Sequence, residues 1–217
     1  MPIHVEELTP RWMTHLLREH ELIDGLTTVR QIKIKEIGDM TGANSDVVFL
    51  NIGYEDGIGP DKIIAKNTPR LGSNVGNFQK WFQREVNFYR LLAPKLKKTS
   101  SLVLPDSYYE EYKETERGTE HLLLLESLAA ENQGDQLRGC SYAEAKRTLG
   151  ALASLHATYW DYSDEDQNLW LPYTTVGLHN AEPVQNAFRA AWKLYEQSGE
   201  VSQLTARLIN QAVDTYP

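Results

Sequence analysis

Apolar residues recur at every second position in several segments of the first 128 residues, a spacing that predicts strands with one buried face. In the clearest case, over 46–54, one side of the predicted strand carries Val48, Leu50, Ile52 and Tyr54. The same kind of pattern predicts four further strands, over 32–35, 61–66, 103–112 and 120–125. No strand–helix–strand unit repeats along this region. We therefore expect one five-stranded antiparallel sheet.

Two segments of the same region have helical spacing instead. Thr9 as N-cap and Pro10 as the first helical residue predict a helix that ends near His20. A second helix is predicted from Phe78 to Leu92, and the lysine-rich segment from Pro94 to Ser101 is predicted to be a solvated connection. The apolar stripe of the second helix comprises Phe78, Trp81, Phe82, Phe88, Tyr89 and Leu92, whereas Gln83, Arg84, Asn87 and Arg90 point elsewhere.

Beyond Leu128 the pattern becomes helical after a small, polar linker over 129–139. Ser141 and Glu144 form a capping box at the start of one helix. Its predicted buried stripe comprises Leu149, Leu152, Leu155, His156 and Tyr159, so we expect His156 to be a core histidine rather than a catalytic base. Two more helices are predicted over 183–198 and 200–213. The fold class is therefore α+β, changing to all-α in the last third.

Glu85 lies in the middle of the apolar stripe of the second helix, where an unpaired carboxylate would be costly. Lys66, at the end of the apolar strand 63–66, is its natural partner. We predict that the two side chains form an ion pair, with Glu85 mostly buried. A strand lysine paired with a helix glutamate is how kinase-type phosphotransferases hold nucleotide phosphates. The alternative is that the pair is only structural, in an unrelated α+β domain.

Bulk properties narrow the class of protein. The 217-residue chain has a net charge of −8, which argues against a general nucleic-acid-binding protein. Its single cysteine, Cys140, excludes an internal disulfide and favours a reducing compartment. The N-terminus lacks the features of a signal peptide, and no apolar stretch is long enough to span a bilayer. We therefore expect a cytoplasmic protein without a membrane partner.

Four segments resemble the aminoglycoside phosphotransferase-like superfamily of small-molecule kinases, especially its ecdysteroid-kinase-like (CHK-kinase-like) branch. They are a nucleotide loop at 42–46, a lysine strand and glutamate helix at 63–66 and 84–89, an interlobe hinge at 122–128, and the first large-lobe helix at 152–160. The resemblance implies a protein-kinase-like two-lobe fold. A small lobe with a leading helix would occupy residues 1–128, and the linker with the first helices of an α-helical large lobe would occupy 129–217.

The resemblance also implies a site for ATP. Lys66 would contact the phosphates and Glu85 would hold Lys66 in place. A loop of backbone N–H groups would receive the β-phosphate, and the hinge would offer backbone groups to adenine. The residues so implied are Gly42, Ala43, Asn44 and Ser45 in the loop, Lys66 and Glu85, and Glu126 and Leu128 in the hinge.

The motifs that carry the catalytic residues of this family are missing from the sequence. The family places its catalytic base in a histidine-x-aspartate motif, with an asparagine five residues after the aspartate and a metal-binding aspartate further on. No histidine of the chain is followed two positions later by aspartate. We therefore expect an N-terminal fragment, with no catalytic residue and with the Mg²⁺ ligands beyond residue 217.

The expected function is ATP-dependent phosphorylation of a hydroxyl on a small molecule, with this chain inactive by itself. The alternative is a non-catalytic, pseudokinase-like module that binds nucleotide. Apolar faces on the last two helices are expected to be partly exposed and to cause self-association: Ala191, Leu194 and Tyr195 on one, and Leu204, Leu208 and Ile209 on the other.

Overall fold

The structure is a computed structural model that describes residues 1–36, 45–68, 79–100, 102–116, 118–128, 138–160, 181–199 and 201–212. The chain forms two compact units, Met1–Asp166 and Gln167–Pro217, which we describe separately. The predicted lobe boundary at 128/129 falls within the first unit and remains a prediction. No helix in the described part of the chain is long and apolar enough to cross a membrane.

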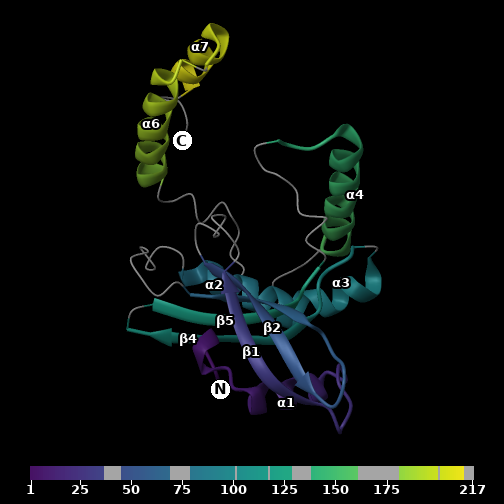
Figure 1. The fold of residues 1–217 in the computed structure, drawn as a ribbon. Helices are drawn as coiled ribbons and strands as arrows, with labels where there is room; N and C mark the ends of the chain where they lie inside the picture. Colours follow the sequence, from purple (N-terminus) through teal and green to yellow (C-terminus); the bar gives the residue numbers. More distant parts are fainter. Residues whose placement is uncertain are drawn as a thin grey trace. The chain divides into compact units, whose positions relative to one another are not determined.

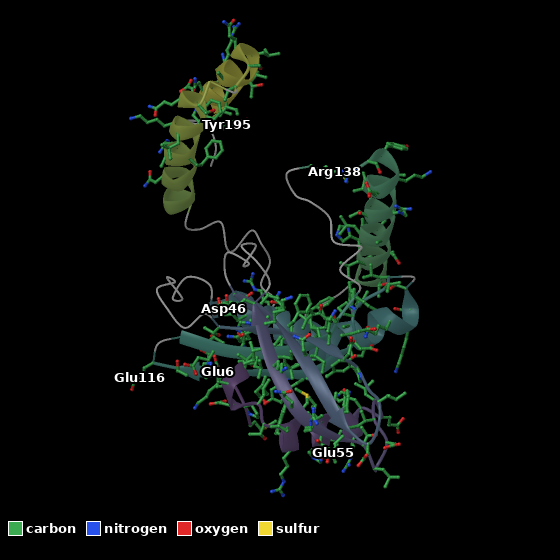
Figure 2. The ribbon with its side chains drawn as sticks, in the orientation of Figure 1. Glu6, Asp46, Glu55, Glu116, Arg138 and Tyr195 are labelled. Carbon is green, nitrogen blue, oxygen red and sulfur yellow. The ribbon has the colours of Figure 1, made fainter. Side chains whose placement is uncertain are left out.

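Five strands form one antiparallel sheet in the first unit, as predicted (Figure 1). The strands are β1 (Thr28–Glu36), β2 (Asp46–Glu55), β3 (Lys62–Asn67), β4 (Ser107–Thr115) and β5 (Gly118–Glu126). Their order across the sheet is β1-β2-β3-β5-β4, and every neighbouring pair is antiparallel. Asp46 and Glu55, the first and last residues of β2, lie at opposite ends of the sheet (Figure 2). The strand predicted over 103–112 begins later, because residues 102–106 have no regular structure.

One face of the sheet packs against α1 (Pro10–Glu19), which follows the short 3-10 helix η1 (Val5–Glu7). The hydroxyl of Thr9 accepts a hydrogen bond from the N–H of Trp12 at 3.2 Å, which confirms the predicted cap. The core on this side joins α1 to all five strands, and its members include Met13, Leu16, Leu17, Val29, Val48, Leu50, Ile63, Ala65, Tyr109, Leu122 and Leu124. The alternating apolar positions of β2 therefore face α1, as their spacing predicts.

The other face of the sheet carries α2 (Gln79–Asn87), which continues through a π-helical turn, η3 (Phe88–Leu92), into α3 (Ala93–Thr99). The prediction of a solvated connection after Leu92 was wrong. Pro94 lies in the first turn of α3, where a helix tolerates proline, and Leu96 is fully buried. The predicted stripe also needs correction, because Asn87 is buried rather than turned away and Val86 is fully buried.

Among the described residues of the first unit, a further helix is α4 (Tyr142–Thr158), and its predicted capping box at Ser141 and Glu144 is confirmed. Its predicted buried stripe is wrong: Leu149 and Leu152 are exposed, and so is His156. Helical spacing identifies an apolar face but not whether another element covers it. The hydroxyl of Tyr159, just after α4, donates to the carbonyl of Leu92 at 2.9 Å.

The second unit contains α6 (Ala181–Gln197) and α7 (Gln203–Ala212). Trp192 of α6 is buried, and its Nε1–H donates to Oδ1 of Asn210 in α7 at 2.6 Å. Leu194 and Tyr195 of α6 are exposed, as are Leu204 and Leu208 of α7. Figure 2 labels Tyr195 on α6. The prediction of exposed apolar faces on these helices is confirmed.

Candidate functional site

The sheet face turned away from α1 carries rows of paired side chains, two of which surround the ion pair predicted from the sequence. In antiparallel strands, directly paired residues lie on the same face. The β2–β3 and β3–β5 registers give one row of Val47, Lys66 and Leu123, and a second row of Phe49, Ile64 and Leu125. Val47, Phe49 and Ile64 are half-buried, whereas Leu123 and Leu125 are buried. Lys66 is therefore a cation at the edge of an apolar surface that is only partly covered.

Lys66 Nζ forms an ion pair with Glu85 Oε1 of α2, as predicted. The side chain of Lys66 is 25% exposed and that of Glu85 is 31% exposed. Glu85 is thus partly buried and less covered than its place on the stripe suggested. Tyr89 lies one turn further along; burial first, and then the charge of Glu85, raise its pKa to about 12. The pair joins the sheet to α2 and remains partly exposed to solvent.

Three more lysines share the face of Lys66. The register pairs Lys33 with Asn51 and Asn51 with Lys62, and it pairs Lys35 with Phe49. All three lysines are exposed. A chain with a net charge of −8 therefore concentrates four lysines on one sheet face. The alternation of residues 32–35 in the sequence predicts that Lys33 and Lys35 lie on one side of a strand. The pairing of β1 with β2 shows that these lysines lie on the same sheet face as Lys66.

His121 of β5 is fully buried on the same side of the sheet, beneath α2. Its Nδ1 lies 2.9 Å from the hydroxyl oxygen of Thr68, which also accepts the His121 N–H at 2.9 Å. Its ring stacks on Phe82, with ring centroids 4.2 Å apart. Burial, and then the positive charge of Lys66, lower the pKa of His121 to about 3. This histidine was missed in the sequence, because one histidine in an apolar strand has no distinguishing pattern.

The other predicted site residues lie around these rows. Ser45 is buried and directly precedes β2, two residues from Val47. Gly42, Ala43 and Asn44 lie outside the described residues. In the predicted hinge, Leu128 is exposed. The N–H of Glu126 is already engaged, since it donates to the carbonyl of Asp106 at 2.7 Å, and a side-chain oxygen of Glu126 accepts the Asp106 N–H at 3.0 Å.

The size of the cavities does not identify the site around Lys66 and Glu85. A cavity of about 490 Å³ adjoins the predicted hinge, and its lining includes Phe49, Lys62, Glu126 and Ser127. A larger one, about 790 Å³, lies between α1 and β1, and its lining includes Arg11 and Arg18. We base the site on the Lys66–Glu85 pair, because these two charged groups carry chemistry that a cavity alone does not.

Within the described ranges, no group of three or more His, Cys, Asp or Glu side chains is arranged to hold a metal ion.

Comparison of the chain with known proteins identifies one protein family. The model of the ecdysteroid kinase-like family matches residues 50–214, which is more than half of the chain and includes Lys66, Glu85 and the predicted hinge. No curated protein and no solved structure matches the chain.

Proposed function

The chain belongs to the ecdysteroid kinase-like family, and from this premise we propose that it binds ATP on the Lys66 face of its sheet. In this proposal the chain supplies the nucleotide-holding part of a phosphotransferase whose acceptor is a hydroxyl group on a small molecule. Family membership implies kinase-like chemistry in general; the nucleotide, the acceptor and the residues that hold them are our proposal. The two-lobe arrangement, with residues 1–128 as the small lobe, belongs to the same proposal.

The observation that carries the proposal is the Lys66–Glu85 ion pair on a lysine-rich face. ATP concentrates several negative charges in its phosphates, so a site for it needs localised positive charge. Lys66 supplies a compact ammonium group, and Glu85 restricts the directions in which this flexible side chain points. Lys35 lies one row from Lys66 on the same face, and it adds positive potential without a direct contact.

Adenine would lie on the apolar part of the same face. Val47, Phe49 and Ile64 are half-buried, so a planar base could cover the surface that they still expose. At the hinge, the N–H of Glu126 is engaged by Asp106, which limits our proposal for this residue to its carbonyl oxygen. Leu128 would use its backbone groups. Ser45 would add a hydroxyl at the phosphate end, next to the loop residues 42–44.

The residues of this chain account for binding more fully than for transfer. Phosphoryl transfer requires an acceptor in line, removal of its proton, and neutralisation of charge on the moving group. The sequence has no histidine-x-aspartate motif, and the described residues offer no metal-binding group, so the proposal assigns neither a base nor a Mg²⁺ ligand to this chain. The second candidate function is nucleotide binding without transfer. The missing histidine-x-aspartate motif favours it.

Two measurements on the 217-residue protein test the nucleotide binding that both functions require and the transfer that we do not assign to this chain. We expect ATP to bind saturably in an equilibrium titration, and we expect no acceptor-dependent ADP formation with a panel of small alcohols. Saturable binding without turnover agrees with the proposal. Turnover with one of the alcohols would show that the transfer residues lie within this chain and that we have missed them. Absence of saturable ATP binding would contradict both candidate functions.

A further inference from the structure

His121 connects the two segments of the chain that carry the Lys66–Glu85 ion pair. Leu122, its neighbour in β5, faces the core beneath α1, and Leu123 pairs with Lys66. His121 therefore belongs to the face of Lys66, one row further along β5, where it is fully buried. It makes separate contacts with the end of β3 and with α2.

The contact with β3 is made through Thr68, which is two residues beyond Lys66. The Thr68 hydroxyl oxygen lies 2.9 Å from the His121 backbone N–H, which donates to it, and 2.9 Å from the ring Nδ1. The backbone N–H of Thr68 also donates to the His121 carbonyl at 3.3 Å. Three hydrogen bonds thus join His121 to the end of the strand that carries the lysine, and one of them holds the imidazole ring.

The contact with α2 is made through Phe82, whose ring is nearly parallel to that of His121, at an interplanar angle of 15°. Phe82 is buried and precedes Glu85 by three residues, which is close to one helical turn. Residues three apart lie on the same side of a helix. The position of the Phe82 ring on the imidazole therefore sets the rotation of α2, and with it the direction of the Glu85 side chain.

Packing alone does not explain an imidazole at this position. Its Nε2 is buried and has no hydrogen-bond partner within the described part of the chain, a state that costs stability. A phenylalanine ring would fill the same volume without that cost. What the histidine adds is Nδ1 at hydrogen-bonding distance from Thr68, which anchors the ring that α2 rests on.

We propose that His121 is a positioning residue that holds α2 so that Glu85 reaches Lys66. The proposal rests on the nucleotide-binding function proposed above, because that function gives the ion pair its use. His121 does not contact the nucleotide in this account. It acts through Thr68 on the lysine strand and through Phe82 on the glutamate helix.

A carbodiimide cross-link tests the positioning directly, because this reagent joins an amine to a carboxylate that is already in contact with it. In the wild-type protein we expect a cross-link between Lys66 and Glu85, measured by mass spectrometry of the digested protein. His121→Phe keeps an aromatic ring for Phe82 but lacks Nδ1, and we expect it to lower the yield of this cross-link at least fivefold. The exposed Lys97–Asp106 ion pair serves as the internal standard, and its cross-link should not change.

Tyr109→Phe is the matched control, because it removes a hydroxyl on the α1 side of the sheet, one that donates to the carbonyl of Pro2 at 2.7 Å. We expect it to leave the Lys66–Glu85 cross-link unchanged. If His121→Phe does not fold, Thr68→Val replaces it, since this variant keeps the histidine and loses the hydroxyl. An unchanged Lys66–Glu85 yield in a folded His121→Phe or Thr68→Val protein would overturn the inference.

An ATP titration of the same proteins separates this inference from the proposed function. Wild-type protein that binds ATP, together with an unchanged cross-link in the variant, refutes only the role of His121. A reduced cross-link in the variant, with wild-type protein that fails to bind ATP, refutes the nucleotide function and leaves His121 as the residue that positions the ion pair.

Discussion

Replacing Lys66 by methionine should weaken ATP binding far more than it weakens the fold. The substitution keeps an unbranched side chain and removes the charge. It leaves Glu85 without its partner, but the Glu85 side chain is 31% exposed and remains hydrated. Ion pairs this accessible contribute about 0–1 kcal/mol. We therefore expect the thermal midpoint to fall by about 2–4 °C at most, the shift that about 1 kcal/mol produces in a domain of this size.

The effect on ATP affinity is larger because two changes act in the same direction. The phosphates lose an ammonium group, and the unpaired Glu85 carboxylate adds repulsion. A unit charge about 4 Å from another contributes about 1 kcal/mol in water and about 4 kcal/mol at an effective dielectric constant of 20. Since Lys66 is 25% exposed, we take a value towards the lower end, about 1.4–2.7 kcal/mol. This corresponds to a loss of ATP affinity of about tenfold to hundredfold.

Lys62→Met is the matched control. Lys62 is on the same strand and the same face, but it is four residues away, which is about 13 Å along a strand. That distance exceeds the screening length of about 10 Å at 0.1 M salt, so we expect less than a twofold change in affinity. Isothermal titration of both variants with ATP at 0.1 M salt measures the difference. Equal losses in the two variants would show that ATP responds to the charge of the whole face and that Lys66 has no special place in it.

Three further predictions concern stability and association. Because the pKa of His121 is lowered to about 3, its contribution to stability is complete above pH 6.5 and is lost as the pH falls towards 3. Between pH 7.5 and pH 5, urea unfolding of the wild type should lose about 2 kcal/mol more than that of His121→Asn, whereas equal losses would show that the imidazole is not buried as described. Gly57→Ala should lower the free energy of unfolding by about 1–3 kcal/mol, because a Cβ atom there would lie 1.8 Å from the Thr27 hydroxyl oxygen. Gly25→Ala is the control, because the space around Gly25 is open, and it should not lower the stability. An unchanged unfolding free energy for Gly57→Ala would contradict this packing. Leu194 is 71% exposed on α6, so Leu194→Glu should lower the mass of self-associated species measured by analytical ultracentrifugation. Circular dichroism should show the same helix content as in the wild type. An unchanged mass would place the association elsewhere.

The five-stranded antiparallel sheet was predictable from the sequence because most of its signal is local. Val48, Leu50 and Ile52 alternate with polar residues, and the short turn after Glu55 leaves antiparallel pairing as the simple solution. The Lys66–Glu85 pair was predictable for a related reason, since a carboxylate on an apolar helix face requires a cation nearby.

The parts that the sequence did not reveal depend on contacts between distant segments. The segment 94–101 was predicted to be a solvated connection, but Pro94 lies in the first turn of α3, and burial of Leu96 stabilises that helix. The apolar stripe of α4 was mistaken for a core face, although Leu149 is 63% exposed. His121 and the lysines of β1 acquire their significance only from pairing between strands, and no spacing along the chain specifies that register.

Labelling with an acyl-phosphate derivative of ATP tests the central claim, that Lys66 lies beside the phosphates of bound ATP, most directly. This reagent transfers its acyl group to an amine near the phosphates, and mass spectrometry identifies the lysine that receives it. We predict that Lys66 is the main labelled residue and that excess ATP suppresses its labelling while labelling of other lysines stays the same. Labelling spread over the surface lysines and unaffected by ATP, or ATP-sensitive labelling at a lysine away from this face, would contradict the account.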